Sequence, residues 1–207
     1  MFSINWPTKS LGKTNSEEIT ALIRRDHEPI KKLILILKDS EVGIAKKRPA
    51  YTEFEHLLSQ HAKAEEKSLY VHMKSEDDLK IEGLEGDTEH NIADTLMKEI
   101  DGISNDENLW SAKVKVLAEL VDHHVKEEEN EVLKQVIKEF DVNTRIEIGK
   151  EYSELLSHFR AEQNGQSKHK SFFDNINGKV GVPILLYFLG VPGFFVILLW
   201  AFFFRGK

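Results

Sequence analysis

The 207-residue chain contains no cysteine and only 5 prolines. Without cysteine it has no disulfide framework, no cysteine-ligated zinc or iron–sulfur site and no thiol nucleophile. The sequence also lacks a Gly-rich phosphate loop, a nucleophile elbow and a His-Glu-x-x-His motif. Its formal net charge of −7 argues against nucleic acid as a partner, because phosphate binding requires a basic face. These absences leave the 9 histidines as the most informative polar residues.

The apolar residues concentrate at the end of the chain. Between Lys179 and Arg205 lie 25 residues without a charge. About 21 helical residues span ~31 Å, the hydrocarbon thickness of a bilayer. Residues 180–204 are therefore predicted to form a single membrane-spanning helix, with the lipid bilayer as a partner. The alternatives are a hairpin that turns at Pro192 and burial of the segment in a protein partner.

The N-terminal segment has no long apolar stretch and no small-residue cleavage site. We therefore expect no signal peptide, and we expect the large N-terminal domain to lie in the cytoplasm. The expected division of the chain is an N-terminal segment at 1–15, a helical domain at 16–163, a linker at 164–179, the membrane segment at 180–204 and a short end at 205–207.

The composition of residues 16–163 is typical of helices. Proline is nearly absent there, and glutamate, lysine, leucine, alanine and isoleucine are abundant. Mostly short connections between successive helices imply antiparallel neighbours. The predicted fold is all-α, an antiparallel up-down four-helix bundle with a fifth flanking helix and a C-terminal membrane helix. The predicted soluble helices cover about residues 16–39, 49–73, 87–103, 107–140 and 141–163.

An internal repeat of 63 residues is the strongest pattern in the sequence. Shifted by 63, His27 falls on His90, and the segment HAKAEE that begins at His61 falls on HVKEEE, which begins at His124. The two histidines of each half are 34 residues apart. Amphipathic helices match in apolar positions by chance, whereas matching histidines are more specific. The repeat selects six polar candidates: His27, His61, Glu65, His90, His124 and Glu128.

The spacing of these candidates points to a metal site. In His-x-x-x-Glu, the two side chains project from one helix face about one turn apart. Both pairs lie on apolar stripes, so Glu65 and Glu128 would be costly to bury as free carboxylates. A metal ion would neutralise them, and four imidazoles with two carboxylates suit iron, manganese or zinc. Each pair could bind one ion, or a glutamate could bridge two, and the two half-sites suggest two ions.

The other histidines are expected to lie outside this site. His158 is the strongest rival, because it follows His124 by 34 residues, but its counterpart in the repeat is Thr95. A ferritin-like carboxylate site is disfavoured, since Glu53-x-x-His56 has no second copy at the repeat-equivalent positions. The histidines set aside are His56, His72, His123, His158 and His169.

The chain resembles the hemerythrin HHE cation-binding family over about residues 16–160. The matching segments are DHEPIKKLI, HAKAEEKSLY, EHNIADTL and HHVKEEENEVL. The resemblance implies a non-haem di-iron centre in which the four selected histidines are iron ligands and the two glutamates are bridging carboxylates. Oxygen-transporting members carry a further histidine four residues after the position of His90, where this chain has Asp94. Their fourth helix typically has an aspartate one residue beyond the position of Glu128, and these departures argue against simple oxygen carriage.

The sequence therefore predicts a membrane-anchored, hemerythrin-like di-iron protein that binds or senses dioxygen or reactive oxygen or nitrogen species. One alternative is a di-iron oxidase or peroxidase-like enzyme, although the sequence has no nucleotide or flavin motif to supply electrons. Another is an iron-responsive adaptor whose folding or docking depends on metal. No feature of the sequence identifies a protein partner.

Overall fold

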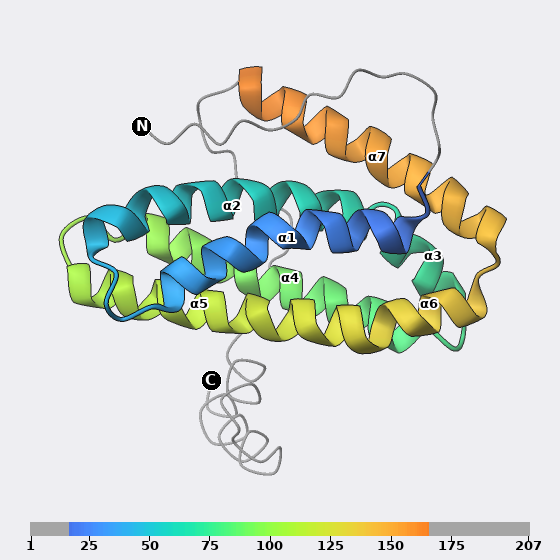
Figure 1. Ribbon diagram of the computed structural model, residues 1–207, viewed down its shortest axis with the longest axis horizontal. Coiled ribbons are helices and arrows are strands. Elements are labelled where there is room, and N and C mark those ends of the chain that lie inside the picture. The colour runs from blue at the N-terminus through green and yellow to red at the C-terminus, as the bar shows by residue number, and fades with distance from the viewer. Residues whose placement is uncertain (1–16, 166–207) are drawn as a thin grey trace, which may run out of the picture.

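The computed structural model describes residues 17–165, and every regular element in this range is helical (Figure 1). The predicted all-helical bundle is confirmed for this part of the chain. The expected N-terminal segment and membrane segment lie outside the described residues, as does most of the expected linker. Within the described range, none of the helices is both long and apolar enough to cross a membrane. The elements are α1 (Ile19–Lys38), α2 (Ile44–Glu66), α3 (Leu69–Ser75), α4 (Lys80–Asp101), α5 (Glu107–Glu127), the π-helix η1 (Glu128–Val132), α6 (Leu133–Glu139) and α7 (Val142–Gly165).

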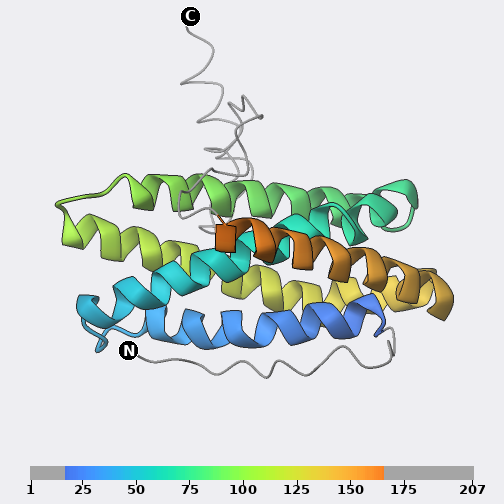
Figure 2. The same ribbon diagram turned by 90° about the horizontal axis from the view of Figure 1, so that it is seen from above.

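Four long helices, α1, α2, α4 and α5, run up and down to form the bundle (Figures 1 and 2). Helix α1 packs against α2 and α5, and α4 packs against α5. Helix α7 lies across the outside of the bundle and packs against α1 and α2. Asp106 and Asp141 cap the helices that follow them, since their side chains accept backbone hydrogen bonds from Leu109 and from Asn143 and Thr144, respectively.

Several helix boundaries differ from the predicted ones. Helix α4 begins at Lys80 rather than near residue 87. Helix α2 begins at Ile44 rather than near Pro49, because Ile44 packs against the core and this contact stabilises an extra turn. Pro49 therefore lies inside the helix. The same helix ends at Glu66, and the chain turns at Ser68 before it continues as α3. The predicted helix over 107–140 is divided by the π-helix η1. Both interruptions lie at the ends of the His-x-x-x-Glu segments: α2 ends one residue after Glu65, and η1 begins at Glu128.

The core consists of two apolar clusters separated by a polar layer. One cluster joins α1, α2, α4 and α5 around residues such as Phe54, and the other joins α1, α3, α6 and α7 around residues such as Met73. On α1, Ile23 belongs to one cluster and Ile30 to the other, with His27 between them. The candidate residues of the other helices also lie between the clusters, so the fold holds their side chains in a buried layer.

Candidate metal centre

The structure brings all six repeat-selected residues together at the centre of the bundle. They come from α1, α2, α4, α5 and the first residue of η1, and each is at most 6% exposed. Their potential ligand atoms form two groups, within each of which all atoms lie within 4.8 Å of one another. The first group is His27, His61 and Glu128, and the second is Glu65, His90 and His124.

The four imidazoles turn their Nε2 atoms toward one another in two pairs. The Nε2 atoms of His27 and His61 are 3.2 Å apart, and those of His90 and His124 are also 3.2 Å apart. Two nitrogens bound about 2.1 Å from one metal ion, at 90–109° to each other, would be about 3.0–3.4 Å apart. Each pair therefore has the separation of two neighbouring ligands of a single ion.

Each glutamate lies between the two groups rather than within its own half of the repeat. Oε2 of Glu128 is 3.1 Å from Nε2 of His27 and 4.0 Å from that of His124. Oε2 of Glu65 is 3.3 Å from Nε2 of His61 and 3.7 Å from that of His90. Of the arrangements left open by the sequence, this geometry favours a carboxylate that reaches both ions over two independent His-x-x-x-Glu half-sites.

The carboxylates of Glu65 and Glu128 are buried without adequate compensation from the protein. Glu65 is 0% exposed and Glu128 is 2% exposed. Within the described part of the chain, none of their four oxygens accepts a hydrogen bond. Buried carboxylates normally have several such partners, and leaving them without any costs several kcal/mol. The residues present thus fit a cationic group bound between them.

In each of the four candidate histidines, the second ring nitrogen, Nδ1, also has a partner. Nδ1 of His27 lies 3.0 Å from Glu129, Nδ1 of His90 lies 3.1 Å from Glu66, and Nδ1 of His124 lies 2.6 Å from Glu89. Partners of this kind fix the ring orientation and tautomer so that Nε2 presents a lone pair to a metal. For His61 that partner is the hydroxyl of Tyr152, 2.9 Å from Nδ1.

These outer carboxylates also follow the repeat, which the sequence analysis did not recognise. Glu66 and Glu129 are 63 residues apart, and each holds the first histidine of the opposite half. A run of charged residues such as 126–131 is typical of a solvated helix face, but Glu129 is only partly exposed and also pairs with Lys31 at 3.0 Å. The sequence does contain a signal for this role, since a Glu-Glu pair follows His-x-x-x in both halves of the repeat.

Both repeat halves turn two adjacent glutamates inward: Glu65 and Glu66 at the end of α2, and Glu128 and Glu129 at the start of the π-helix η1. In an α-helix, neighbouring side chains point about 100° apart. Residues of η1 make wider i→i+5 turns, and such insertions are frequent at functional sites. Glu128 reaches the centre, and Glu129 reaches His27 from the side. The sequence contains no proline or glycine in this segment that would have signalled the irregularity.

Glu89 and Asp26 are a second pair of carboxylates related by the repeat, and they contact their histidines in different ways. Glu89 contacts His124 directly, but its counterpart Asp26 reaches its histidine only through Tyr152. The Tyr152 hydroxyl donates to Asp26 at 2.9 Å and accepts from Nδ1 of His61. This tyrosine comes from α7, outside the repeat, and no sequence pattern marked it.

Replacing Tyr152 with phenylalanine is expected to weaken metal binding about 10- to 100-fold, because His61 then loses the partner that orients it. Metal affinity by competition with a chelator measures this. Tyr51→Phe is the matched control, since the Tyr51 hydroxyl contacts Met97 and Asp101 within an apolar cluster. Equal losses in both variants would show that the effect is only one of packing.

The protonation of the metal-free centre is uneven. Burial disfavours the charged form of His27, but Glu128 and Glu129 outweigh it and raise the pKa of His27 to about 9. Burial and the charge of Glu128 raise the pKa of Glu65 well above its usual range. Burial and the charge of His27 lower the pKa of His61 to about 3. At neutral pH, His27 therefore holds a proton and His61 does not, and Glu65 keeps its proton to a higher pH than an exposed carboxyl does.

Metal binding is accordingly expected to release protons. His27 must deprotonate before Nε2 can act as a ligand, so the apparent affinity should rise about tenfold per pH unit per displaced proton as pH increases toward 9. Anaerobic calorimetric titration in buffers of different ionisation enthalpy counts these protons. Glu129→Gln should weaken the pH dependence, because it removes a carboxylate that holds the proton on His27. A binding heat that does not depend on the buffer would contradict this.

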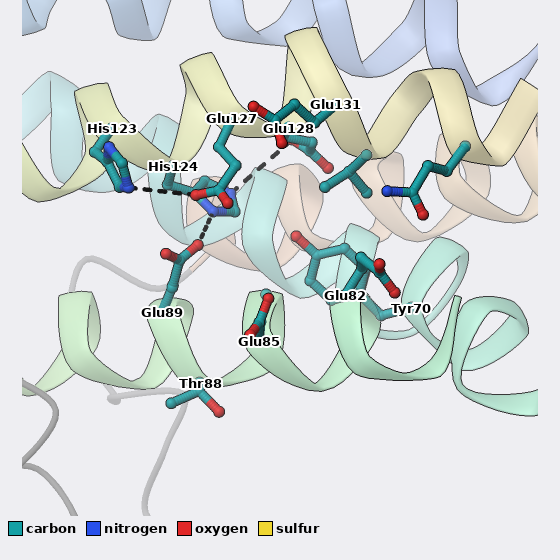
Figure 3. Close-up of a pocket in the computed structure, with 13 residues that line it drawn as sticks. Tyr70, Glu82, Glu85, Thr88, Glu89, His123, His124, Glu127, Glu128 and Glu131 are labelled. Atoms are coloured by element: carbon teal, nitrogen blue, oxygen red, sulfur yellow. Dashed lines mark hydrogen bonds and ion pairs between the residues drawn. The ribbon is translucent and has the colours of Figure 1, made fainter. Parts of the chain in front are cut away.

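A cavity of about 450 Å³ opens beside the centre, lined in part by His124 and Glu128 (Figure 3). Buried Tyr70 forms another part of its wall, and its ring stacks on His90 at a centroid separation of 5.4 Å. Gly86 permits this close packing, since a Cβ at that position would lie 2.5 Å from Cζ of Tyr70. The cavity thus reaches one residue of each group, Glu128 of the first and His124 of the second.

The other described histidines lie outside the centre. His56 and His123 are exposed. His72 and His158 instead pair with glutamates at 3.0 and 3.2 Å, respectively. His169 lies outside the described residues. The distinction drawn from the repeat thus matches the positions of the eight histidines that the structure describes.

Comparison with known families adds an independent finding. A family model described as Hemerythrin HHE cation binding domain matches residues 18–136. The match covers more than half of the chain and includes all six candidate residues, whereas Tyr152 and α7 lie beyond it. No curated protein and no solved structure matches the chain.

Proposed function

The chain belongs to the hemerythrin HHE cation-binding family, and from this premise we propose that it is a non-haem di-iron protein that binds or senses dioxygen or reactive oxygen or nitrogen species. The family implies metal binding, with iron as the typical metal. The proposed iron ligands are His27, His61, Glu65, His90, His124 and Glu128.

One observation carries the proposal. Two pairs of Nε2 atoms, each 3.2 Å apart, enclose two buried glutamates whose oxygens accept no hydrogen bond within the described chain. A purely structural polar layer would satisfy such groups internally. Two cations would neutralise both carboxylates, and Glu65 and Glu128 are placed to reach both positions.

The surroundings of the centre support a small uncharged ligand. When bound, iron supplies redox chemistry and an affinity for dioxygen, peroxide or nitric oxide. The cavity beside His124 gives such molecules access, and its carboxylates do not repel uncharged species. Asp94, at the position of the additional histidine of oxygen carriers, is buried and pairs with Lys98 at 3.0 Å. This difference favours sensing or reaction over transport.

Spectroscopy of the protein reconstituted with Fe²⁺ under anaerobic conditions tests the proposal. A charge-transfer band that appears with dioxygen and disappears on its removal would support binding. Sustained turnover with peroxide would instead support the oxidase or peroxidase-like alternative. A change in helicity or partner binding that follows iron alone would favour the adaptor. Absence of bound iron after reconstitution would contradict the di-iron proposal.

For the C-terminal region we propose a single-pass membrane anchor at 180–204, with the helical domain in the cytoplasm. The support is the run of 25 uncharged residues between Lys179 and Arg205, long enough to cross a bilayer. The full-length protein should remain with membranes in high salt and in alkaline carbonate. Reporters fused to either end should lie on opposite sides. Release by salt alone would indicate a protein partner, and termini on one side would indicate a hairpin.

A further inference from the structure

The cavity beside the centre is strongly acidic. No lysine or arginine contributes to its lining within the described part of the chain. Two histidines, one of them the candidate ligand His124, are the only titratable nitrogen bases in this lining. The glutamates that line it are Glu82, Glu85, Glu89, Glu127, Glu128 and Glu131.

These carboxylates lead from solvent to the centre (Figure 3). Glu85, Glu127 and Glu131 are exposed at the outside. The side chain of Glu89, farther in, is 13% exposed and holds Nδ1 of the candidate ligand His124. Glu128 is 2% exposed, and among residues 17–165 neither of its oxygens accepts a hydrogen bond, with Nε2 of the candidate ligand His27 lying 3.1 Å from Oε2. The innermost carboxylate is therefore the one with the greatest need of a cation.

The carboxylates at the mouth influence one another electrostatically. Burial and the negative charges of Glu127, Glu82 and Glu89 together raise the pKa of Glu85. Charges of one sign in a cleft with low-dielectric walls focus the field and increase the local concentration of counter-ions. The cavity should attract cations and repel anions.

We propose that this cavity is the entrance through which a divalent metal cation, Fe²⁺ in the first instance, reaches the centre from solution. The inference rests on the proposed di-iron function. A cation with six waters occupies about 200 Å³, at roughly 30 Å³ per water, and fits within the cavity of about 450 Å³. The outer glutamates attract the hydrated ion, and Glu128 receives it as the first buried ligand.

The rate of iron uptake tests this entrance. The full-length chain in non-ionic detergent, freed of metal, is mixed anaerobically with Fe²⁺, and a chromogenic chelator reports the unbound ion over time. The variant Glu85→Gln/Glu127→Gln/Glu131→Gln should take up Fe²⁺ about 10-fold more slowly at low salt, with a weaker salt dependence. Its final iron content should equal that of the unmodified chain. Glu127→Lys alone should also slow uptake.

The matched control changes the same net charge away from the cavity, in Glu41→Gln/Glu53→Gln/Glu147→Gln, whose three positions are exposed and outside the cavity lining. Equal uptake rates in all variants, or equal slowing in both triple variants, would overturn the entrance. A lower final iron content in the cavity variant would also overturn it, because those glutamates would then be equilibrium ligands. If the unmodified chain binds no iron, it is the di-iron proposal that fails.

Discussion

Removal of the metal ions is expected to lower the melting temperature of the protein by roughly 15–30 °C. A site saturated a thousandfold above its Kd adds about 4 kcal/mol to the free energy of unfolding, and two such sites add about 8 kcal/mol. For a domain of this size, 1 kcal/mol corresponds to roughly 2–4 °C. The structural reason is that the centre then loses the ions that buried Glu65 and Glu128 would bind, and protons on His27 and Glu65 replace them only in part. Thermal unfolding, followed by circular dichroism before and after chelation, measures the change.

Glu65→Gln separates the metal contribution from the packing of the centre. Burial and the charge of Glu128 raise the pKa of Glu65 well above its usual range and so favour the neutral carboxyl, which the amide of the variant resembles. The variant should melt near the temperature of the metal-free parent, whether or not metal is supplied. An unmodified chain whose melting curve is unchanged after verified metal removal would contradict the prediction.

The sequence predicts that the six candidate residues lie together, because a shift of 63 residues aligns the histidines and glutamates of one half with those of the other. Once helices of equal spacing pack antiparallel, His27 and His61 are placed at the same depth, and so are His90 and His124. The assignment of each glutamate is different. Sequence spacing links Glu128 with His124, whereas the shorter distance is to His27 in the opposite half. Distances across a bundle depend on helix rotation, which spacing along one helix does not fix.

The partners around the centre were harder to predict for two physical reasons. Glu129 and its counterpart Glu66 each contact a histidine on a helix of the opposite half, and spacing along their own helix does not show such a contact. Tyr152 belongs to α7, whose place across α1 and α2 is set by tertiary packing rather than by the repeat. Without that placement, a lone tyrosine carries no sign that it joins Asp26 to His61.

Substitution of a single proposed ligand is expected to reduce the iron content from about two ions per chain to less than one. His61→Ala removes one of the two nitrogens that converge at 3.2 Å, and Glu128→Ala removes a carboxylate near histidines of both groups. Because Glu128 lies between the groups, its loss should affect both ions rather than one. Iron per chain, measured by elemental analysis after anaerobic reconstitution, gives the result directly.

The matched controls for these ligand variants are His56→Ala and His123→Ala, since both histidines are exposed and lie outside the two groups. Both controls should retain about two ions, although His123 directly precedes the proposed ligand His124. Each variant is compared at equal helicity, so that loss of fold is not mistaken for loss of a ligand. If the controls lose as much iron as His61→Ala, the proposed ligands do not form the metal site. If Glu128→Ala retains one ion at full occupancy, its carboxylate serves a single position and the bridging arrangement is wrong.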